Sequence, residues 1–298
     1  MDVRHLELLR ELADRGSVTA VAAATHRTVS AVSQQLRTAQ REFGMALVEP
    51  DGRGVRLTDA GRLLADGAVS VQSALAQVQA TWDAYRDNPG GEVSMLAFPS
   101  AAALIFPPAL RAAADAGVRL RLHDRDPAEA DFARLSSDVD IVIGHSLDGR
   151  GPVGTDGLDV VHLTVEPLDI AMRADHPLTE PAQLRARDVA EAEWIGVPDG
   201  YPFDAVLRAV AAAAGRELSV PQRLRDNRVM EAMVRASDAV CVLPRFTTVA
   251  DDGLVLREIV DVHAERTLSA VMRPDRARRR AVQTVLDAVV DALAEFER

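Results

Sequence analysis

The chain has 298 residues, of which 48% are hydrophobic, and its formal net charge is −11. This length predicts two or three domains, and the apolar fraction is sufficient for buried cores. The single cysteine, Cys241, excludes an internal disulfide and fits a reducing compartment. No segment has the apolar core of a secretory signal, and no apolar run approaches the ~20 residues of a membrane helix. A cytoplasmic protein with no membrane partner is therefore expected.

The negative charge is spread unevenly along the chain. Residues 1–88 hold 10 arginines against 11 acidic residues, so most of the net charge lies in the remainder. Within residues 27–56, five arginines outnumber three acids. Because a local positive excess is what attracts a phosphate backbone, residues 27–56 are where contact with nucleic acid is expected.

The first part of the chain has the pattern of three helices followed by a hairpin. Apolar spacing predicts the helices over residues 3–15, about 18–24 and about 28–43. Gly16 ends the first helix, Ser17 or Thr19 caps the second, and Gly44 ends the third. The predicted third helix has apolar residues on one face and Ser, Gln and Arg elsewhere. Such a helix packs on its own core and offers hydrogen-bonding groups to a DNA groove.

A hairpin and a long helix are predicted next. Strands over 47–49 and 55–57 flank the turn signal Asp51-Gly52. Thr58 caps a helix that extends to about residue 86, with apolar residues at steps of three and four. This heptad stripe comprises Leu57, Gly61, Leu64, Ala68, Val71, Leu75, Val78, Trp82 and Tyr85. A stripe of this length favours pairing with a second copy, and the alternative is a core helix of one large domain. The residues predicted to form the dimer contact are Leu64, Ala68, Val71, Leu75, Val78 and Trp82.

After Gly91 the pattern becomes that of an α/β domain. Strands are predicted over residues 93–98, 118–122, 139–143, 160–165, 168–172, 194–197, 239–243 and 268–272. Several are continuously apolar, as buried parallel strands are. Helices are predicted over residues 203–215, 228–235 and about 276–296.

Short motifs in the first 61 residues carry a family resemblance: Gly16-Ser17, Ala22, Ala31-Val32-Ser33, Gln35-Leu36, Phe43-Gly44, Leu47, Leu57-Thr58 and Ala60-Gly61. In these motifs, and in its layout from end to end, the chain resembles the LysR-type transcriptional regulators. Departures from the family pattern at Thr25, Val29-Ser30 and Pro50 indicate a divergent branch.

The resemblance implies a domain layout. A winged helix-turn-helix domain is expected over residues 1–58, and a linker helix over residues 59–88. An α/β effector domain, two-lobed like a periplasmic binding protein, is expected over residues 92–298. Its first lobe would hold residues 92–166 and 268–298, and its second lobe residues 167–267. The resemblance also implies a homotetramer built as a dimer of dimers.

Double-stranded DNA is the macromolecular partner that this layout predicts. Ser30, Ser33, Gln34 and Arg37 on the recognition helix are candidates for contact with base edges or adjacent phosphates. Arg27 at the entry to this helix, and Arg53 and Arg56 on the hairpin, are candidates for phosphate contact. Thr28 completes the predicted DNA-binding set. A two-fold dimer is expected to bind an inverted repeat.

A small-molecule effector is the second predicted partner. Following the family layout, the ligand lies between the two lobes. The predicted effector-binding residues are Ser100, Ala101, His145, Tyr201, Phe203, Asn227 and Phe246. Free backbone N–H groups at a helix start near Ser100 can hold an anion, so an anionic metabolite is one candidate ligand. Hinges are expected near Glu166-Pro167 and Arg266-Thr267.

No catalytic residue, metal site or cofactor is predicted. Gly149, Gly151 and Gly154 form a GxGxxG pattern, but Pro152 lies inside it and no helix is predicted to follow. Cys241 lies in an apolar run that indicates a buried, unreactive thiol. The sequence therefore predicts a DNA-binding transcriptional regulator under effector control. The alternatives are a ligand-independent repressor whose α/β domain serves only oligomerisation, and a solute-binding or enzymatic two-lobed protein.

Overall fold

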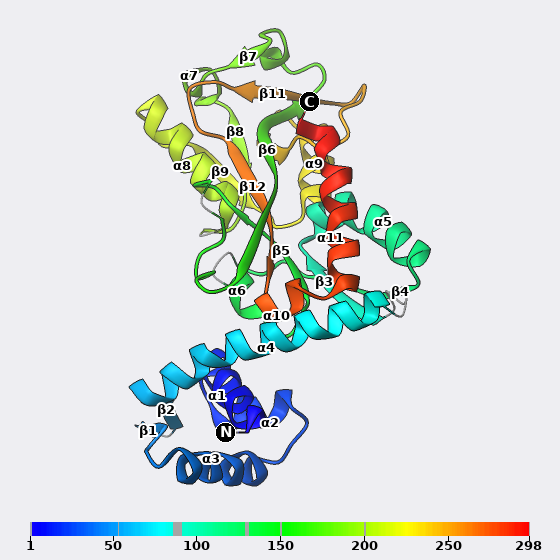
Figure 1. Ribbon diagram of the computed structural model, residues 1–298. Helices are drawn as coiled ribbons and strands as arrows, with labels where there is room; N and C mark the ends of the chain where they lie inside the picture. Colours follow the sequence, from blue (N-terminus) through cyan, green and yellow to red (C-terminus); the bar gives the residue numbers. More distant parts are fainter. Residues whose placement is uncertain are drawn as a thin grey trace. The chain divides into compact units, whose positions relative to one another are not determined.

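The computed structural model describes residues 2–52, 54–85, 91–128, 131–149, 151–199 and 201–297. The chain divides into two compact units (Figure 1). The first unit holds residues 1–89 and 273–280, and the second holds residues 90–272 and 281–298. The sequence-based layout differs on one point, because it places residues 273–280 in the α/β domain. Among the described residues, every helix is too short or too polar to span a membrane.

Three helices open the first unit: α1 (Val3–Arg15), α2 (Val18–Ala24) and α3 (Val29–Phe43). Their predicted ends are confirmed. Gly16 ends α1 with a φ of +71°, a value that glycine adopts without steric cost. The Ser17 hydroxyl accepts a hydrogen bond from the Ala20 N–H at 3.1 Å and so caps α2.

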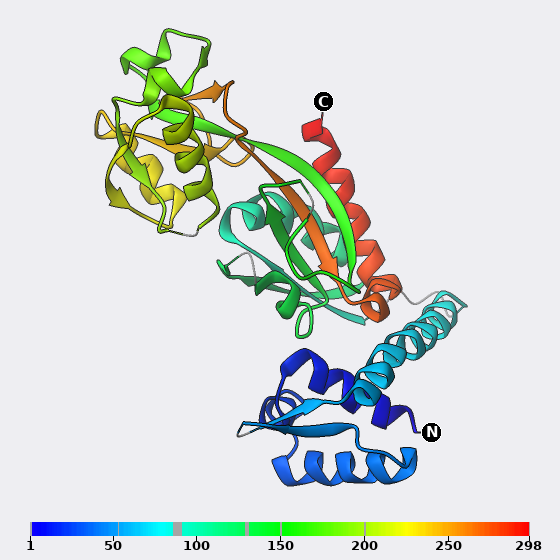
Figure 2. The ribbon, with the colours of Figure 1, turned by 90° about the vertical axis from the view of Figure 1, so that its left-hand side faces the viewer.

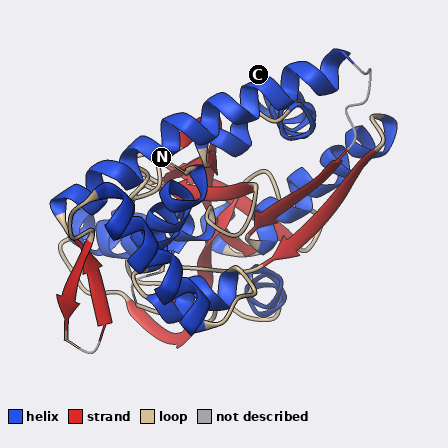
Figure 3. Ribbon diagram, turned by 60° about the horizontal axis from the view of Figure 1, so that its bottom comes forward, coloured by secondary structure: helices blue, strands red, loops and turns tan. Residues whose placement is uncertain are grey.

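A hairpin, β1 (Val48–Asp51) and β2 (Gly54–Leu57), follows and projects beside the helices (Figure 3). The Thr58 hydroxyl accepts a hydrogen bond from the Gly61 N–H at 3.1 Å, so Thr58 caps α4 (Asp59–Tyr85) as predicted. Gly61 is required where α4 meets the hairpin. A Cβ atom there would lie 2.1 Å from the Leu47 carbonyl oxygen, far inside contact distance.

The segment of residues 273–280 packs within the first unit through α10 (Pro274–Ala277). The buried Arg273 lies 3.2 Å from a Glu11 carboxylate oxygen and donates to the Gln72 side-chain oxygen at 3.2 Å. Arg10, also buried, lies 3.2 Å from an Asp275 carboxylate oxygen. These pairs attach α10 to α1 and α4.

The second unit contains one mixed sheet that runs through two lobes (Figure 2). The strands of the first lobe are β3 (Gly91–Ala97), β4 (Val118–Asp124) and β5 (Ile141–Ser146). The strands of the second lobe are β7 (Gln183–Leu184), β8 (Glu193–Gly196), β9 (Ser219–Arg223), β10 (Val240–Pro244) and β11 (Leu254–Ile259). Two long antiparallel strands, β6 (Asp159–Arg173) and β12 (Glu265–Met272), run between the lobes.

The prediction of two strands over 160–165 and 168–172 was wrong, because β6 is a single strand of 15 residues. Glu166-Pro167 has the composition of a turn, yet the ladder continues through it. The Pro167 carbonyl accepts from the Arg245 N–H at 3.0 Å, and the next residue, Leu168, donates to the Ala264 carbonyl at 2.8 Å. Proline lacks only the N–H, and here its carbonyl makes the contact.

Helices cover both lobes. They are α5 (Pro99–Asp115), α6 (Phe132–Leu135), α7 (Ala186–Val189), α8 (Pro202–Ala214), α9 (Asn227–Arg235) and α11 (Arg280–Leu293), with short 3-10 segments at Pro177–Thr179 and Ala294–Glu297. The predicted single helix over 276–296 was wrong, because α10 ends before α11 begins. The break falls where the chain passes between the two units, since α10 packs in the first unit and α11 lies almost wholly in the second.

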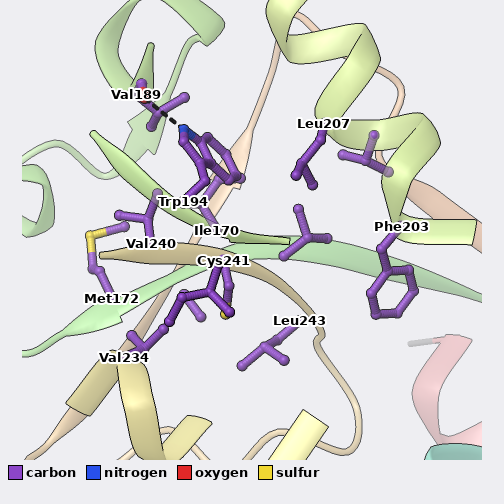
Figure 4. Close-up of a cluster of buried hydrophobic side chains, with 14 of the residues drawn as sticks. Ile170, Met172, Val189, Trp194, Phe203, Leu207, Val234, Val240, Cys241 and Leu243 are labelled. Atoms are coloured by element: carbon purple, nitrogen blue, oxygen red, sulfur yellow. Dashed lines mark hydrogen bonds between the residues drawn. The ribbon is translucent and has the colours of Figure 1, made fainter. Parts of the chain in front are cut away.

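The core of the second lobe surrounds Trp194, whose ring is fully buried and donates to the Val189 carbonyl at 3.1 Å (Figure 4). Cys241 lies in this core with no exposed surface. Burial among apolar side chains raises the pKa of the Cys241 thiol. The prediction of a buried, unreactive thiol is thus supported by its surroundings.

Candidate DNA-binding surface and effector pocket

The recognition helix α3 separates its polar and apolar faces as predicted. Val32, Leu36 and Ala39 are buried against the helical core. Gln34 and Arg37 are exposed, and they share a concave surface with Arg41. Within the part of the chain that the structure describes, no hydrogen bond or ion pair is recorded for the Arg37 guanidinium. This side chain is therefore available to an external partner.

The entry to α3 is ordered by hydrogen bonds. The Thr28 hydroxyl accepts from the Ala31 N–H at 3.2 Å and caps the helix. Arg27 donates to the Gln35 side-chain oxygen at 2.5 Å, and the Gln35 amide donates to the Arg4 carbonyl at 2.9 Å. Gln35 thus fixes the position of the Arg27 guanidinium beside the start of α3.

The hairpin presents less free positive charge than the sequence suggests. Arg56 lies 2.7 Å from a carboxylate oxygen of Glu49, the residue directly opposite it in the ladder. This pair offsets the charge that was predicted to meet phosphate. Arg53, the other hairpin candidate, lies outside the described residues. Ser30 and Ser33 are on α3 as predicted, and Ser30 is exposed.

Gln40 has a structural role that the sequence did not reveal. Its side-chain oxygen accepts hydrogen bonds from the Leu47 N–H at 3.0 Å and the Val48 N–H at 3.4 Å. The C-terminal half of α3 is thereby attached to the start of β1. No local sequence signal identifies this contact, because a glutamine on a helix is most often solvated.

The heptad stripe of α4 changes character along the helix. Ala68 is fully buried and Leu64 packs on the core of the first unit. Further along, Leu75, Val78 and Trp82 are 53%, 68% and 53% exposed. Large apolar side chains at this spacing mark a surface for association. Val71 is half-buried between the two ends, and the Tyr85 side chain lies outside the described residues.

A pocket of about 170 Å³ lies between the two lobes of the second unit. Five of the predicted effector-binding residues line it: Ser100, His145, Tyr201, Phe203 and Asn227. The sequence missed the charged residues of its lining, which are Asp126, Arg225, Asp226, Arg228, Glu231 and Arg266. The predicted contacts of Ala101 and Phe246 are not among its lining. Ala101 is fully buried at the start of α5, and the Phe246 ring packs on Phe296 at 4.8 Å.

A buried ion pair forms the rear of the pocket, at the two predicted hinges. Arg266 on β12 donates to one carboxylate oxygen of Glu166 on β6, at 2.7 Å from Nε and 2.5 Å from Nη2. Arg266 also donates to the Ser100 hydroxyl at 3.0 Å. The second oxygen of Glu166 accepts from the Phe246 N–H at 2.9 Å. The hinge strands, the start of α5 and the loop after β10 thus meet at one ion pair, with Ser100 bonded to Arg266 and Phe246 to Glu166.

The aromatic lining is kept uncharged. The His145 ring packs edge-on against Phe98, at 5.0 Å between ring centroids, and against Phe132 at 5.1 Å. Burial, assisted by the nearby charge of Arg266, lowers the pKa of His145 to about 3. The imidazole is therefore neutral at physiological pH, and its buried Nδ1 has no hydrogen-bond partner within the described residues.

The start of α5 has no side-chain cap, so no cap side chain accepts from the first backbone N–H groups of the helix. Phe98 is the N-cap residue and provides no side-chain cap. Ser100 lies inside the helix and is not its cap. At α9 the cap is Asp226, whose carboxylate accepts from the Arg228 and Val229 N–H groups at 2.8 and 3.2 Å. Asn227 is thus the first residue of α9 and lines the pocket.

Two consecutive parts of the chain match models of known protein families. The family model for bacterial regulatory helix-turn-helix proteins of the lysR family matches residues 3–62, and that for the LysR substrate binding domain matches residues 86–294. Together with the fold, these matches define a transcriptional regulator with a DNA-binding and an effector-binding domain, a class of regulators and not of enzymes. The chain belongs to the LysR family.

Curated relatives match the chain over almost its full length. The HTH-type transcriptional regulator PcaQ of Agrobacterium fabrum is 24% identical over 300 residues, which cover 98% of this chain and 95% of PcaQ. The DNA-binding transcriptional dual regulator OxyR of Escherichia coli is 22% identical over 298 residues, with 97% and 95% covered.

Solved structures share the fold. A full-length OxyR variant from Pseudomonas aeruginosa aligns with a TM-score of 0.63 at 20% identity, covering 97% of this chain and 94% of the other. Full-length CbnR complexed with its target DNA aligns with a TM-score of 0.53 at 18% identity, covering 97% and 100%. The fold class that the resemblance implied, a helix-turn-helix domain together with an α/β effector domain, is confirmed.

Proposed function

We propose that this regulator reads its operator through the exposed face of α3, with Ser30, Ser33, Gln34 and Arg37 toward the major groove. Residues 1–58 serve as the DNA-binding domain. The observation that carries this proposal is the exposed Arg37 guanidinium, which lies next to Gln34 on a helix whose other face is buried. Arginine and glutamine form the bidentate base contacts that distinguish guanine and adenine.

Because its target is chromosomal DNA, we propose that the protein acts in the cytoplasm and has no enzymatic activity.

The DNA contact is tested by footprinting the promoter fragment upstream of the protein's own gene, followed by gel-shift titration with Arg37→Ala. We expect a roughly 5- to 150-fold loss of operator affinity, which corresponds to ~1–3 kcal/mol. Arg111→Ala removes another exposed arginine, from α5, and is the matched control. Equal affinity of both variants and the wild type would remove Arg37 from the interface.

Phosphate contacts have a different signature from base contacts. Arg27 is held beside the start of α3 by Gln35, so we assign it to the DNA backbone. Replacing it should weaken binding to all sequences alike. The slope of the logarithm of the binding constant against the logarithm of the salt concentration should become shallower by about one. Arg56 already pairs with Glu49, so its contribution is expected to be smaller.

Two chains pair through the exposed part of α4, which serves as the dimerisation helix. A two-fold pair presents two recognition helices to an inverted repeat. Replacing Leu75 and Val78 by Glu places two charges in the apolar contact and is expected to yield a monomer in light scattering. Leu110→Glu, at a similarly exposed leucine on α5, should leave the dimer intact. A double variant that remains dimeric would place the contact elsewhere.

A small molecule between the lobes controls the DNA-binding part. A ligand that binds an open and a closed arrangement with different affinity shifts their populations. The buried Glu166–Arg266 pair links the hinge strands to Ser100 in the pocket. The pair thereby connects the arrangement of the two lobes with the presence of a ligand in the pocket. A footprint that is identical with and without every pocket ligand would favour the ligand-independent repressor. The chain cannot form an internal disulfide as a regulatory switch, because Cys241 is its only cysteine and is buried.

A further inference from the structure

We propose that the pocket between the lobes binds an α-amino acid with an apolar side chain, whose ammonium group faces Asp126 and whose carboxylate faces Arg225. This inference rests on the proposed effector function of the pocket and adds the chemistry of the ligand. It is based on the charged residues that line the pocket. Most of them already have partners within the protein, and two do not.

Four charged residues of the lining, Arg266, Arg228, Glu231 and Asp226, have partners of their own. The Arg266 guanidinium pairs with Glu166, and both side chains are buried. Arg228 lies 3.3 Å from a Glu231 carboxylate oxygen. The Asp226 carboxylate accepts backbone N–H groups of α9. The two ion pairs carry no net charge, and the Asp226 carboxylate is engaged by the N-terminus of α9.

Asp126 and Arg225 are the two charges that remain. Asp126 follows β4 in the first lobe, and Arg225 follows β9 in the second lobe, so they line the pocket from opposite sides. Within the described residues, no hydrogen bond or ion pair is recorded for the Asp126 carboxylate. Arg225 lies over the Tyr201 ring, 4.9 Å from its centroid, and no acidic partner is recorded for it within the described residues.

The charge of Asp126 is only partly compensated by the arginines of the pocket. Partial loss of hydration raises the pKa of Asp126, and the charges of Arg225 and Arg266 only partly oppose this. The Arg225 charge is thus close enough to lower the pKa of Asp126, although the two side chains form no ion pair. A ligand that carries an ammonium and a carboxylate on the same carbon atom, as an α-amino acid does, would neutralise both groups at once.

The remainder of the pocket suits an apolar side chain. The Phe98 and Phe203 rings line it on either side of the hinge pair. The neutral His145 ring adds a third aromatic surface without positive charge, so it does not compete for the carboxylate. A volume of about 170 Å³ is suited to a ligand with one small aliphatic or aromatic group, because a cavity of ~150 Å³ holds benzene.

The test compares ligands that differ by one charged group, using the full-length protein and calorimetric titration. L-leucine is compared with isocaproate, which lacks the amino group, and with isoamylamine, which lacks the carboxylate. L-phenylalanine, hydrocinnamate and phenethylamine form a second series. We expect one of the two amino acids to bind more tightly than both of its analogues by on the order of tenfold or more.

Two variants locate the charges. Asp126→Asn should abolish the preference for the amino acid over its deaminated acid, while Arg225→Met should weaken both by on the order of tenfold. Asp124→Asn and Arg216→Met, at exposed residues outside the pocket lining, are the matched controls. Thermal unfolding checks that all four variants fold.

The outcomes separate this inference from the proposed function. Binding of neither amino acid, or equal binding of acid and amino acid by the wild type, overturns the zwitterion proposal. So does an unchanged preference in folded Asp126→Asn. In each case, operator footprinting with and without other small molecules still decides whether the protein is an effector-controlled regulator.

Discussion

The side chains proposed to contact bases come from one helix of 15 residues, α3, whereas the pocket joins residues from both lobes of the second unit. Ser100 and Arg266, which share a hydrogen bond, are 166 positions apart in the chain. A surface on one helix depends mainly on the local stability of that helix. A pocket built from distant segments depends on the few contacts that hold those segments together, so the two sites should respond differently to substitution.

The largest effect is expected from breaking the hinge pair. Glu166→Ala removes a fully buried carboxylate and leaves the Arg266 guanidinium buried without its partner. Such a loss costs about 3–5 kcal/mol of unfolding free energy. Chemical denaturation measures it, with Glu217→Ala at an exposed glutamate as the control. A loss below ~1 kcal/mol would mean that the pair is hydrated and does not organise the pocket.

An intermediate effect is expected from pH, acting through His145 in the pocket. His145 has a pKa of about 3 in the folded protein against 6.5 for the free side chain. The unfolded chain therefore binds a proton that the folded chain excludes, and stability is lost as pH falls below 6.5 toward 3. Relative to His145→Gln, the wild type should lose ~1.4 kcal/mol between pH 7.5 and pH 5.5. Parallel stability curves for the two proteins would show that His145 is hydrated.

The smallest effect is expected in the DNA-binding unit. Gln40→Ala removes the acceptor for the Leu47 and Val48 N–H groups, at a cost of about 1 kcal/mol. Operator binding should weaken modestly, since α3 keeps its own hydrogen bonds. Gln77→Ala on α4 is the control. If Gln40→Ala instead abolished DNA binding, the recognition helix would depend on the hairpin as strongly as the pocket depends on its hinge.

The parts of the fold that the sequence predicted are those with local signals. Helices α1 to α4 have apolar periodicity together with Gly16, Ser17, Gly44 and Thr58 at their ends, and those residues act within one turn of the chain. The strand β9 was missed because it is mostly exposed and contains Pro221, so it has neither the alternation nor the apolar run of a typical strand.

Five pocket residues were predicted because the family resemblance places them at the ends of predicted strands and helices. Asp126 and Arg225 were not, because each lies in a connection with no periodic pattern. Glu166 and Arg266 were recognised only as hinge positions. Their ion pair joins residues 100 positions apart, and no signal within either segment shows that they meet.

The chain passes from the first lobe into the second and returns through neighbouring strands, β6 and β12. The first and last residues of the second lobe are adjacent, since the Leu168 N–H donates to the Ala264 carbonyl at 2.8 Å. The segment between them is therefore an insertion with joined ends, of the kind that can be exchanged as a module. Grafting the corresponding lobe of another family member at these two positions should alter ligand choice while preserving the first lobe and operator specificity.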